Sequence, residues 1–175
     1  MSYLGAPLMS VNQTWGTPSK FMEYMKTHIH FVPDLDAAAS FENKKANRYF
    51  SELDNSLNKD WFGKVWLNPP FGKVLLPKFL DKCNEQIQRD EVEEIFVLIP
   101  ARTDTKWFHE KVMKGAKYIY LIKGRFNFES PYSTDGANAP FPSMLVHYVG
   151  KTYNNNIGKV IIKTLDVPKE YRGWK

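Results

Sequence analysis

The sequence predicts a three-layer α/β fold, in which one sheet, mostly parallel with an antiparallel edge, lies between two layers of helices. Segments with helical spacing of apolar residues alternate with short apolar runs, and several strand-like runs follow near the end of the chain. The run at residues 94–100 is almost continuously apolar, which is typical of a central strand covered on both faces. No repeat, low-complexity tract or linker divides the chain, so we expect a single compact domain over residues 1–175.

Three segments have the apolar spacing of amphipathic helices. The first is capped by Thr17, has Pro18 at its first helical position, and extends to about residue 29. The second covers about residues 75–89 and carries Cys83 on its apolar face, so we expect this cysteine in the core. The third, at residues 104–115, follows the central strand.

The remaining apolar runs are predicted strands, at residues 30–35, 64–67, 94–100, 118–122, 144–149 and, more weakly, 160–162. The strand at 64–67 stops at Asn68-Pro69-Pro70, because neither proline can donate a hydrogen bond to a neighbouring strand. A stretch rich in Pro, Gly, Asn and Ser lies between the strands at 118–122 and 144–149. It has no periodicity and is too long for a simple connector, so we predict a functional loop at residues 126–143.

The charge composition is compatible with a nucleic-acid partner. The chain has 24 Lys and Arg against 19 Asp and Glu, a net charge of +5. Several groups of basic residues have an aromatic neighbour, and nucleic-acid sites combine these residue types to bind phosphate and stack bases. A solvated basic surface is the alternative interpretation.

Other site classes are not expected. A single cysteine excludes an internal disulfide, and the four histidines form no HExxH pair, so we expect no metal site. No apolar run approaches the roughly 20 residues that span a bilayer. The first residues lack the pattern of a secretory signal, so we expect a cytoplasmic protein without membrane contact.

The stretch Asn68-Pro69-Pro70-Phe71 carries the clearest chemistry. It follows a predicted strand, and open α/β sheets bind ligands beyond the carboxyl ends of their strands. The prolines stiffen the turn, so the Asn68 amide oxygen and the Pro69 carbonyl form a fixed pair of acceptors for the two N–H groups of an exocyclic amine. The Phe71 ring offers a face to a flat heterocycle. The pattern suits methylation of an amine, and it suits equally a diproline turn that ends the strand with Phe71 in the core.

Six stretches occur in an order that is typical of one enzyme family: Trp15-Gly16-Thr17-Pro18, residues 34–40, Asn68-Pro69-Pro70-Phe71, residues 100–109, Gly124-Arg125-Phe126 and residues 139–143. Over about residues 15–149 the chain resembles the small phage-type DNA N6-adenine methyltransferases, Dam-like enzymes that use S-adenosyl-L-methionine. The resemblance implies a Rossmann-like methyltransferase three-layer sandwich, double-stranded DNA as the partner, and a phage or prophage protein that acts in a bacterial host cell.

The resemblance also implies roles for individual residues. The catalytic residues would be Asn68, Pro69, Pro70 and Phe71. The cofactor-binding residues would be Trp15, Thr17, Pro18, Asp34, Asp36 and Ala37. Which of the two acids contacts the cofactor ribose, and which its ammonium group, stays open. The basic residues expected to contact DNA are Lys73, Arg102, Lys106 and Arg125.

The predicted function is transfer of the methyl group of S-adenosyl-L-methionine to the exocyclic amine of a flipped-out adenine. The loop at residues 126–143 would help to read the target sequence, because little chain remains for a separate recognition domain. Two alternatives stay open. One is a methyltransferase for RNA adenine or protein glutamine, since an amide also presents an NH2 group; the other is a nucleic-acid-binding module without catalysis. The sequence defines no oligomeric state.

Overall fold

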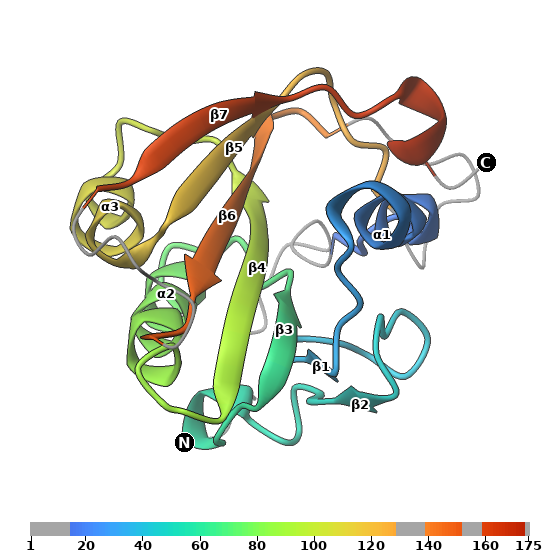
Figure 1. Ribbon diagram of the computed structural model, residues 1–175. Helices are drawn as coiled ribbons and strands as arrows, with labels where there is room; N and C mark the ends of the chain where they lie inside the picture. Colours follow the sequence, from blue (N-terminus) through green and yellow to red (C-terminus); the bar gives the residue numbers. More distant parts are fainter. Residues whose placement is uncertain (1–14, 129–138, 152–158, 174–175) are drawn as a thin grey trace.

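The computed structural model describes residues 15–128, 139–151 and 159–173. Along the chain the elements follow one another (Figure 1) in the order α1 (Ser19–Tyr24), η1 (Met25–Ile29, a π-helical continuation of α1), β1 (Leu35–Asp36), β2 (Arg48–Tyr49), η2 (Ser56–Asn58), β3 (Gly63–Leu67), α2 (Leu75–Gln86), β4 (Val92–Pro100), η3 (Phe108–Val112), α3 (Met113–Gly115), β5 (Tyr118–Ile122), β6 (Ser143–Val149), β7 (Ile161–Leu165) and η5 (Lys169–Tyr171).

The strands form one sheet in the order β2-β1-β3-β4-β6-β5-β7. All neighbouring pairs are parallel except those of β6, which is antiparallel to both β4 and β5. The predicted α/β fold with a mostly parallel sheet is therefore confirmed. The antiparallel strand, however, lies inside the sheet and not at its edge. The burial of the two last strands explains this: most residues of β6 are buried, whereas β7 is almost entirely exposed and suits the outer position.

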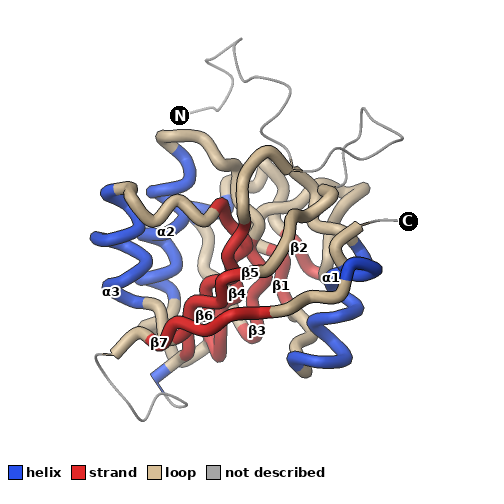
Figure 2. Tube along the Cα trace, turned by 90° about the horizontal axis from the view of Figure 1, so that it is seen from above, coloured by secondary structure: helices blue, strands red, loops and turns tan. Residues whose placement is uncertain are grey.

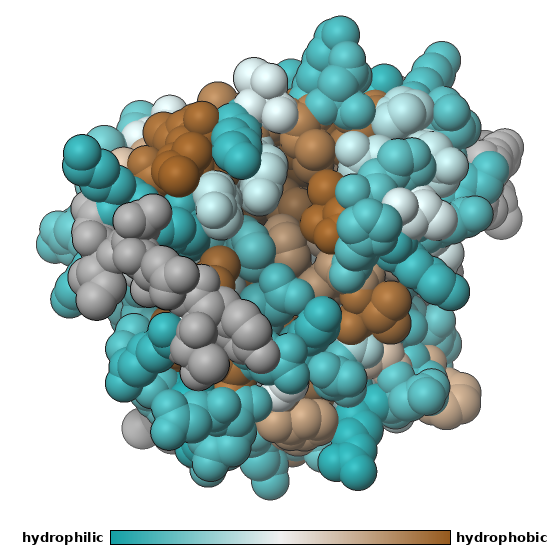
Figure 3. Space-filling view, viewed as in Figure 1, coloured by the Kyte–Doolittle hydropathy of each residue, from teal (hydrophilic) through white to brown (hydrophobic). Residues whose placement is uncertain are grey.

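Helices cover the sheet on both sides and complete three layers (Figure 2). On one side, α2 and α3 pack against the strand residues that point towards them, among them Val65, Val97 and Val146. On the other side, α1 and η1 pack against Trp66, Phe96 and Leu145. Successive residues of a strand point to opposite faces, so each strand contributes to both cores. Because α1 is short, this second face is only partly covered, and Figure 3 shows apolar residues in a hollow near its middle, beside α1.

The predicted helices form: α1 and η1 together match the first of them, and the other two have shorter bounds than expected. The segment predicted at 75–89 is helical over Leu75–Gln86, and that predicted at 104–115 contains η3 and α3. Cys83 is fully buried on the inner face of α2, as predicted, and burial raises the pKa of its thiol far above the usual range. Cys83 is therefore a core residue and not a reactive thiol.

The strand predicted at residues 30–35 is mostly a connector. His30 adopts a left-handed conformation with φ 60°, and the N–H of Phe31 donates to the carbonyl of Met25 at 3.0 Å, which ends the helical stretch. Pro33 has no N–H for a neighbouring strand. Only Leu35–Asp36 pairs with neighbouring strands, as β1. It lies between β3 and β2, and β2 was not predicted.

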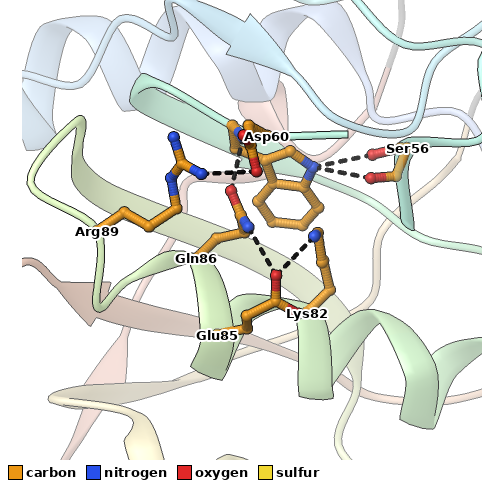
Figure 4. A network of polar contacts seen from close by, with 7 residues as sticks. Ser56, Asp60, Lys82, Glu85, Gln86 and Arg89 are labelled. Atoms are coloured by element: carbon orange, nitrogen blue, oxygen red, sulfur yellow. Dashed lines mark hydrogen bonds and ion pairs between the residues drawn. The ribbon is translucent and has the colours of Figure 1, made fainter. Parts of the chain in front are cut away.

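Buried polar contacts (Figure 4) hold the start of β3, the strand that leads to Asn68. The side-chain Oε1 of Gln86 accepts the main-chain N–H of Trp61 at 2.7 Å, and the Trp61 indole N–H donates to the main-chain oxygen of Ser56 at 3.2 Å. Arg89 and Asp60 form an ion pair at 2.6 Å at the border of this network. The end of α2 and the start of β3 are therefore fixed to each other.

Gln86→Ala should lower the free energy of unfolding by about 2 kcal/mol, because it leaves the buried N–H of Trp61 without an acceptor. Chemical denaturation of the parent and the variant measures the change. Gln88→Ala is the matched control. Gln88 is exposed just after the end of α2, so its truncation should cost no more than about 0.5 kcal/mol. Equal stability of the two variants would contradict the role of the Gln86 amide.

Candidate functional site

The carboxyl ends of β1, β3, β4 and β5 lie at one edge of the sheet, because these strands run in the same direction. β2 and β3 lie on opposite sides of β1. After β2 the chain therefore crosses to the other side of β1 to form β3. In open α/β sheets, ligands bind beyond the carboxyl ends of the strands at such a switch point. The segments that follow Asp36 and Leu67 are therefore the first candidates for a binding site.

Asn68 directly follows β3, and its side chain is oriented by the main chain of Trp15. The Asn68 Nδ2 donates a hydrogen bond to the Trp15 carbonyl oxygen. The Asn68 Oδ1 is buried and has no hydrogen-bond partner within the described residues. Because a carbonyl oxygen can only accept, the Trp15 contact determines which end of the amide is the donor. A buried acceptor without a partner costs about 1–3 kcal/mol, so Oδ1 is a candidate for binding an N–H donor from a ligand.

Four aromatic rings form a cluster that includes Trp15, whose main chain binds Asn68, and Phe71, which follows Asn68 in the same turn. Phe71 contacts Phe128 and Phe141, with ring centroids 6.2 and 5.6 Å apart, and the Phe71 and Phe141 planes are nearly perpendicular. Trp15 contacts the same two rings at 5.6 and 5.8 Å. The turn after β3, the segment before α1 and both ends of the predicted loop therefore form one aromatic cluster, which includes the residue whose carbonyl binds the Asn68 amide.

Trp66, in β3, connects the segment before α1 to the sheet. Its indole N–H donates to the Thr17 hydroxyl at 3.3 Å, and its carbonyl accepts the N–H of Ala37 at 2.9 Å. Thr17 was predicted to cap the first helix; instead it is buried against Trp66, and Pro18 occupies the capping position of α1. The indole of Trp66 requires a buried acceptor, and the Thr17 hydroxyl fulfils this requirement.

The structure separates the two acids around β1. Asp36 ends the strand and is 3% exposed, and its carboxylate accepts main-chain N–H groups of Ala38 at 3.3 Å and Lys45 at 2.9 Å. Burial raises the pKa of Asp36 to about 6, and the two hydrogen bonds and the Lys45 charge oppose this shift. Asp34 precedes the strand, and its carboxylate accepts the N–H of Lys64 at 2.9 Å. Only Asp36 therefore lies at the carboxyl end of β1.

The four basic residues predicted to contact DNA are exposed and lie on three segments, after β3, after β4 and after β5: Lys73, Arg102, Lys106 and Arg125. No ion pair within the described residues involves Lys73 or Arg102. Lys106 lies 3.7 Å from Glu110, and Arg125 donates to the carbonyl of Ala139 at 3.2 Å. Lys73 and Arg102 are therefore the two with charges most available to a partner.

Sequence reasoning did not identify Phe128 and Phe141 as parts of the site. The sequence feature that could have identified them is their position in the predicted functional loop at 126–143. Residues 129–138 of that loop lie outside the described residues. Both rings sit beside Phe71 because the N–H of Ala139 donates to the carbonyl of Phe126 at 2.8 Å, which brings the two ends of the loop together. This pairing is not visible in the local pattern of residues.

The described residues form neither a metal-binding cluster nor a membrane-spanning helix. Within residues 15–128, 139–151 and 159–173, no group of three or more His, Cys, Asp or Glu side chains is arranged to hold a metal ion. In the same part of the chain, no helix has both the length and the apolar character needed to cross a membrane.

Comparisons with known proteins place the chain near phage enzymes. A family model described as DNA N-6-adenine-methyltransferase (Dam) matches residues 7–170. A DNA N-6-adenine-methyltransferase of Escherichia phage T1 is 36% identical over 115 residues, which cover 64% of this chain and 46% of that protein. A DNA N-6-adenine-methyltransferase of Haemophilus phage HP1 (strain HP1c1) is 28% identical over 141 residues, which cover 78% of this chain and 79% of that protein. The chain thus spans less than half of the T1 protein.

Asp36 should make stability depend on pH. Its folded-state pKa of about 6 exceeds the value of about 3.9 usual for the unfolded chain, so between these values the folded state binds the additional proton. Stability therefore falls as pH rises from about 4 to 6. The expected cost, complete above pH 6, is on the order of 3 kcal/mol.

Chemical denaturation of the parent and of Asp36→Asn at each pH measures this cost. The stability of the variant relative to the parent should rise by about 2 kcal/mol from pH 4 to 7, because part of the cost is already present at pH 4. Asp34→Asn, which removes an exposed carboxylate at the other end of β1, is the control for loss of one negative charge. A difference between Asp36→Asn and the parent that stays constant with pH would contradict the burial of an ionised Asp36.

Proposed function

We propose that this chain, which belongs to the DNA N-6-adenine-methyltransferase (Dam) family, transfers the methyl group of S-adenosyl-L-methionine to the N6 amine of adenine in double-stranded DNA. The family membership confirms the resemblance that the six sequence stretches predicted. The observation that carries the proposal is the buried Oδ1 of Asn68, an acceptor without a partner in the described residues, in a turn whose Phe71 belongs to a cluster of aromatic rings.

The turn after β3 would bind the amine. In the proposed complex the Asn68 Oδ1 accepts one N–H of the adenine amine, and the Pro69 carbonyl accepts the other. Two acceptors on the N–H groups direct the nitrogen lone pair away from the turn, towards an electrophilic carbon. The two prolines restrict the backbone, so little ordering is needed when the substrate binds.

The target adenine would leave the duplex before it reacts, because its amine is paired inside the double helix. Flipping costs a few kcal/mol, which stacking of the base on an aromatic ring helps to offset. Phe71 is the proposed stacking partner, and its contacts with Phe128 and Phe141 support the orientation of its ring. Pro70, between the second acceptor and this ring, stiffens the connection.

The cofactor would bind beyond the carboxyl ends of β1 and β3. It supplies an electrophilic methyl group on a sulfonium and also carries an ammonium group. The residues present fit such a cation, since Asp36 is a buried carboxylate whose raised pKa reflects incomplete compensation of its charge. Ala37, Trp15, Thr17 and Pro18 adjoin this region and complete the proposed cofactor site. Asp34 is not carried into the proposal, because its carboxylate binds the N–H of Lys64.

The exposed basic residues after β3, β4 and β5 are proposed to contact DNA phosphates around the flipped base. Their positions along one edge of the sheet support this role. We further propose that the single domain of residues 1–175 carries out the reaction, with the loop at 126–143 taking part in reading the target. A polar, positively charged rim binds any sequence, so base readout needs an additional element.

The function is tested by incubating the protein with radiolabelled S-adenosyl-L-methionine and unmethylated duplex DNA, and separating the digested nucleosides. Label should appear in N6-methyladenine nucleoside. Equal amounts of RNA and of an acceptor protein, offered in parallel, test the alternative substrates. Preferential label in RNA, in protein or in another base would overturn the proposal.

Asn68→Ala should lower the turnover number by a factor of about 100 or more, because the amine acceptor acts mainly on the way to the transition state. Cofactor affinity, measured by calorimetry, should stay within a few-fold of the parent. Phe71→Tyr serves as a comparison, since it keeps an aromatic face and should be mild. Unchanged turnover of Asn68→Ala would remove the turn from the reaction.

Arg102→Ala should weaken DNA binding about equally on all sequences and reduce the salt dependence by about one counterion, as expected for a phosphate contact. Binding isotherms over a salt series measure the affinity and its salt dependence, on a duplex that the protein methylates and on a scrambled duplex. Lys59→Ala is the matched control, because Lys59 is exposed before the start of β3, at the opposite edge of the sheet. An equal effect of both variants would argue for a non-specific surface charge.

A further inference from the structure

The contact between Asn68 and the main chain of Trp15 restricts which residue can act at position 68. The Trp15 carbonyl oxygen binds the Asn68 Nδ2, and the opposite atom of the amide, Oδ1, is buried without a partner in the described residues. Position 68 therefore requires a side chain with a donor on one side and an acceptor on the other. Asparagine is such a side chain, whereas an ionised aspartate has only acceptors.

We propose that the main-chain carbonyl of Trp15 is a positioning group that makes this site dependent on a neutral, donor-bearing side chain at position 68. The inference rests on the proposed function, in which Oδ1 binds the substrate amine. In the variant Asn68→Asp, the ionised carboxylate would direct one oxygen at the Trp15 carbonyl, where two acceptors face each other with no proton between them. Such an unpaired, partly desolvated contact is unfavourable. A protonated carboxyl group would restore the donor towards Trp15 and leave one oxygen for the amine.

The neighbourhood of Trp15 prevents the carbonyl from simply moving away. Two residues later, the hydroxyl of Thr17 accepts the indole N–H of Trp66, and both side chains are almost fully buried. The Trp15 ring lies against Phe128 and Phe141. The main chain is therefore held by the side chain of Trp15 itself and, two residues later, by the attachment of Thr17 to β3.

Asn68→Asp tests the inference through its pH dependence. We expect turnover at pH 8 to fall by a factor of about 100 or more, comparable to the loss of one preorganised hydrogen bond in a catalytic site. As pH is lowered, the ratio of variant to parent turnover should rise about tenfold per unit, following the protonated fraction. Ionisable groups on the segments that follow the neighbouring strands include Asp36, Lys45, Lys73, Arg102, Asp104 and Arg125; all are present in both proteins, so the ratio largely cancels their titration.

Thermal unfolding gives a readout that does not depend on activity. The melting temperature of Asn68→Asp should fall relative to the parent as pH rises, because the buried carboxyl is stable only while protonated. Asn68→Ala is the control: it removes the same hydrogen bond without adding a titrating group, so its deficit should not vary with pH. Cofactor affinity of Asn68→Asp should stay within a few-fold of the parent.

The outcomes separate the two proposals. If the parent methylates adenine but Asn68→Asp matches the parent in turnover, or has a turnover ratio and a stability deficit that do not vary with pH, the role of Trp15 is wrong and the proposed function stands. If the parent methylates no adenine while the stability of Asn68→Asp still falls with rising pH, the structural constraint stands and the proposed function falls.

Discussion

The pairing of β3 between β1 and β4 is the constraint on which the site depends. Its register aligns Trp66 with Asp36 on one side and with Phe96 on the other, which fixes the height at which the strand ends. Pro69 and Pro70 cannot continue the ladder, so Asn68 emerges beside the end of β1. The same strand anchors the segment before α1 through the indole of Trp66. One central strand therefore positions both the amide and the carbonyl that orients it.

The parts of the fold that could be predicted from the sequence are those with a strong local pattern. The continuous apolar run of β4 and the periodic face of α2 each require burial, wherever the rest of the chain lies. In contrast, β1 and β2 have only two residues each and exist because they pair with each other and with β3. The inner position of β6 likewise depends on competition with β7 for a buried place, which no single segment encodes.

The same distinction applies to the site. The turn Asn68-Pro69-Pro70-Phe71 is contiguous, so its acceptors and ring were recognisable from the sequence. The other rings of the cluster come from segments more than 50 residues away, and their approach follows from tertiary contacts such as that between Ala139 and Phe126. The sequence does not distinguish Asp34 from Asp36. The course of the chain around β1 places Asp36 at the edge of the sheet, whereas Asp34 binds the main chain of β3.

Two local features of this edge oppose stability. The Asn68 Oδ1 is buried without a partner in the described residues, and Asp36 is a buried carboxylate with a raised pKa. Other buried polar atoms of the described chain also lack a partner, among them the Asn127 Oδ1 and the Tyr148 hydroxyl, so what sets the Asn68 Oδ1 apart is its place directly after β3, at the edge where ligands bind. Folded proteins usually satisfy or remove unpaired groups, and exceptions concentrate where a ligand supplies the missing partner. An amine can donate to an amide oxygen and a cation can compensate a carboxylate, so the two features suit two different ligand groups. That pair of needs matches a reaction in which an amine meets a positively charged methyl donor, with one residue at the end of each of two adjacent strands.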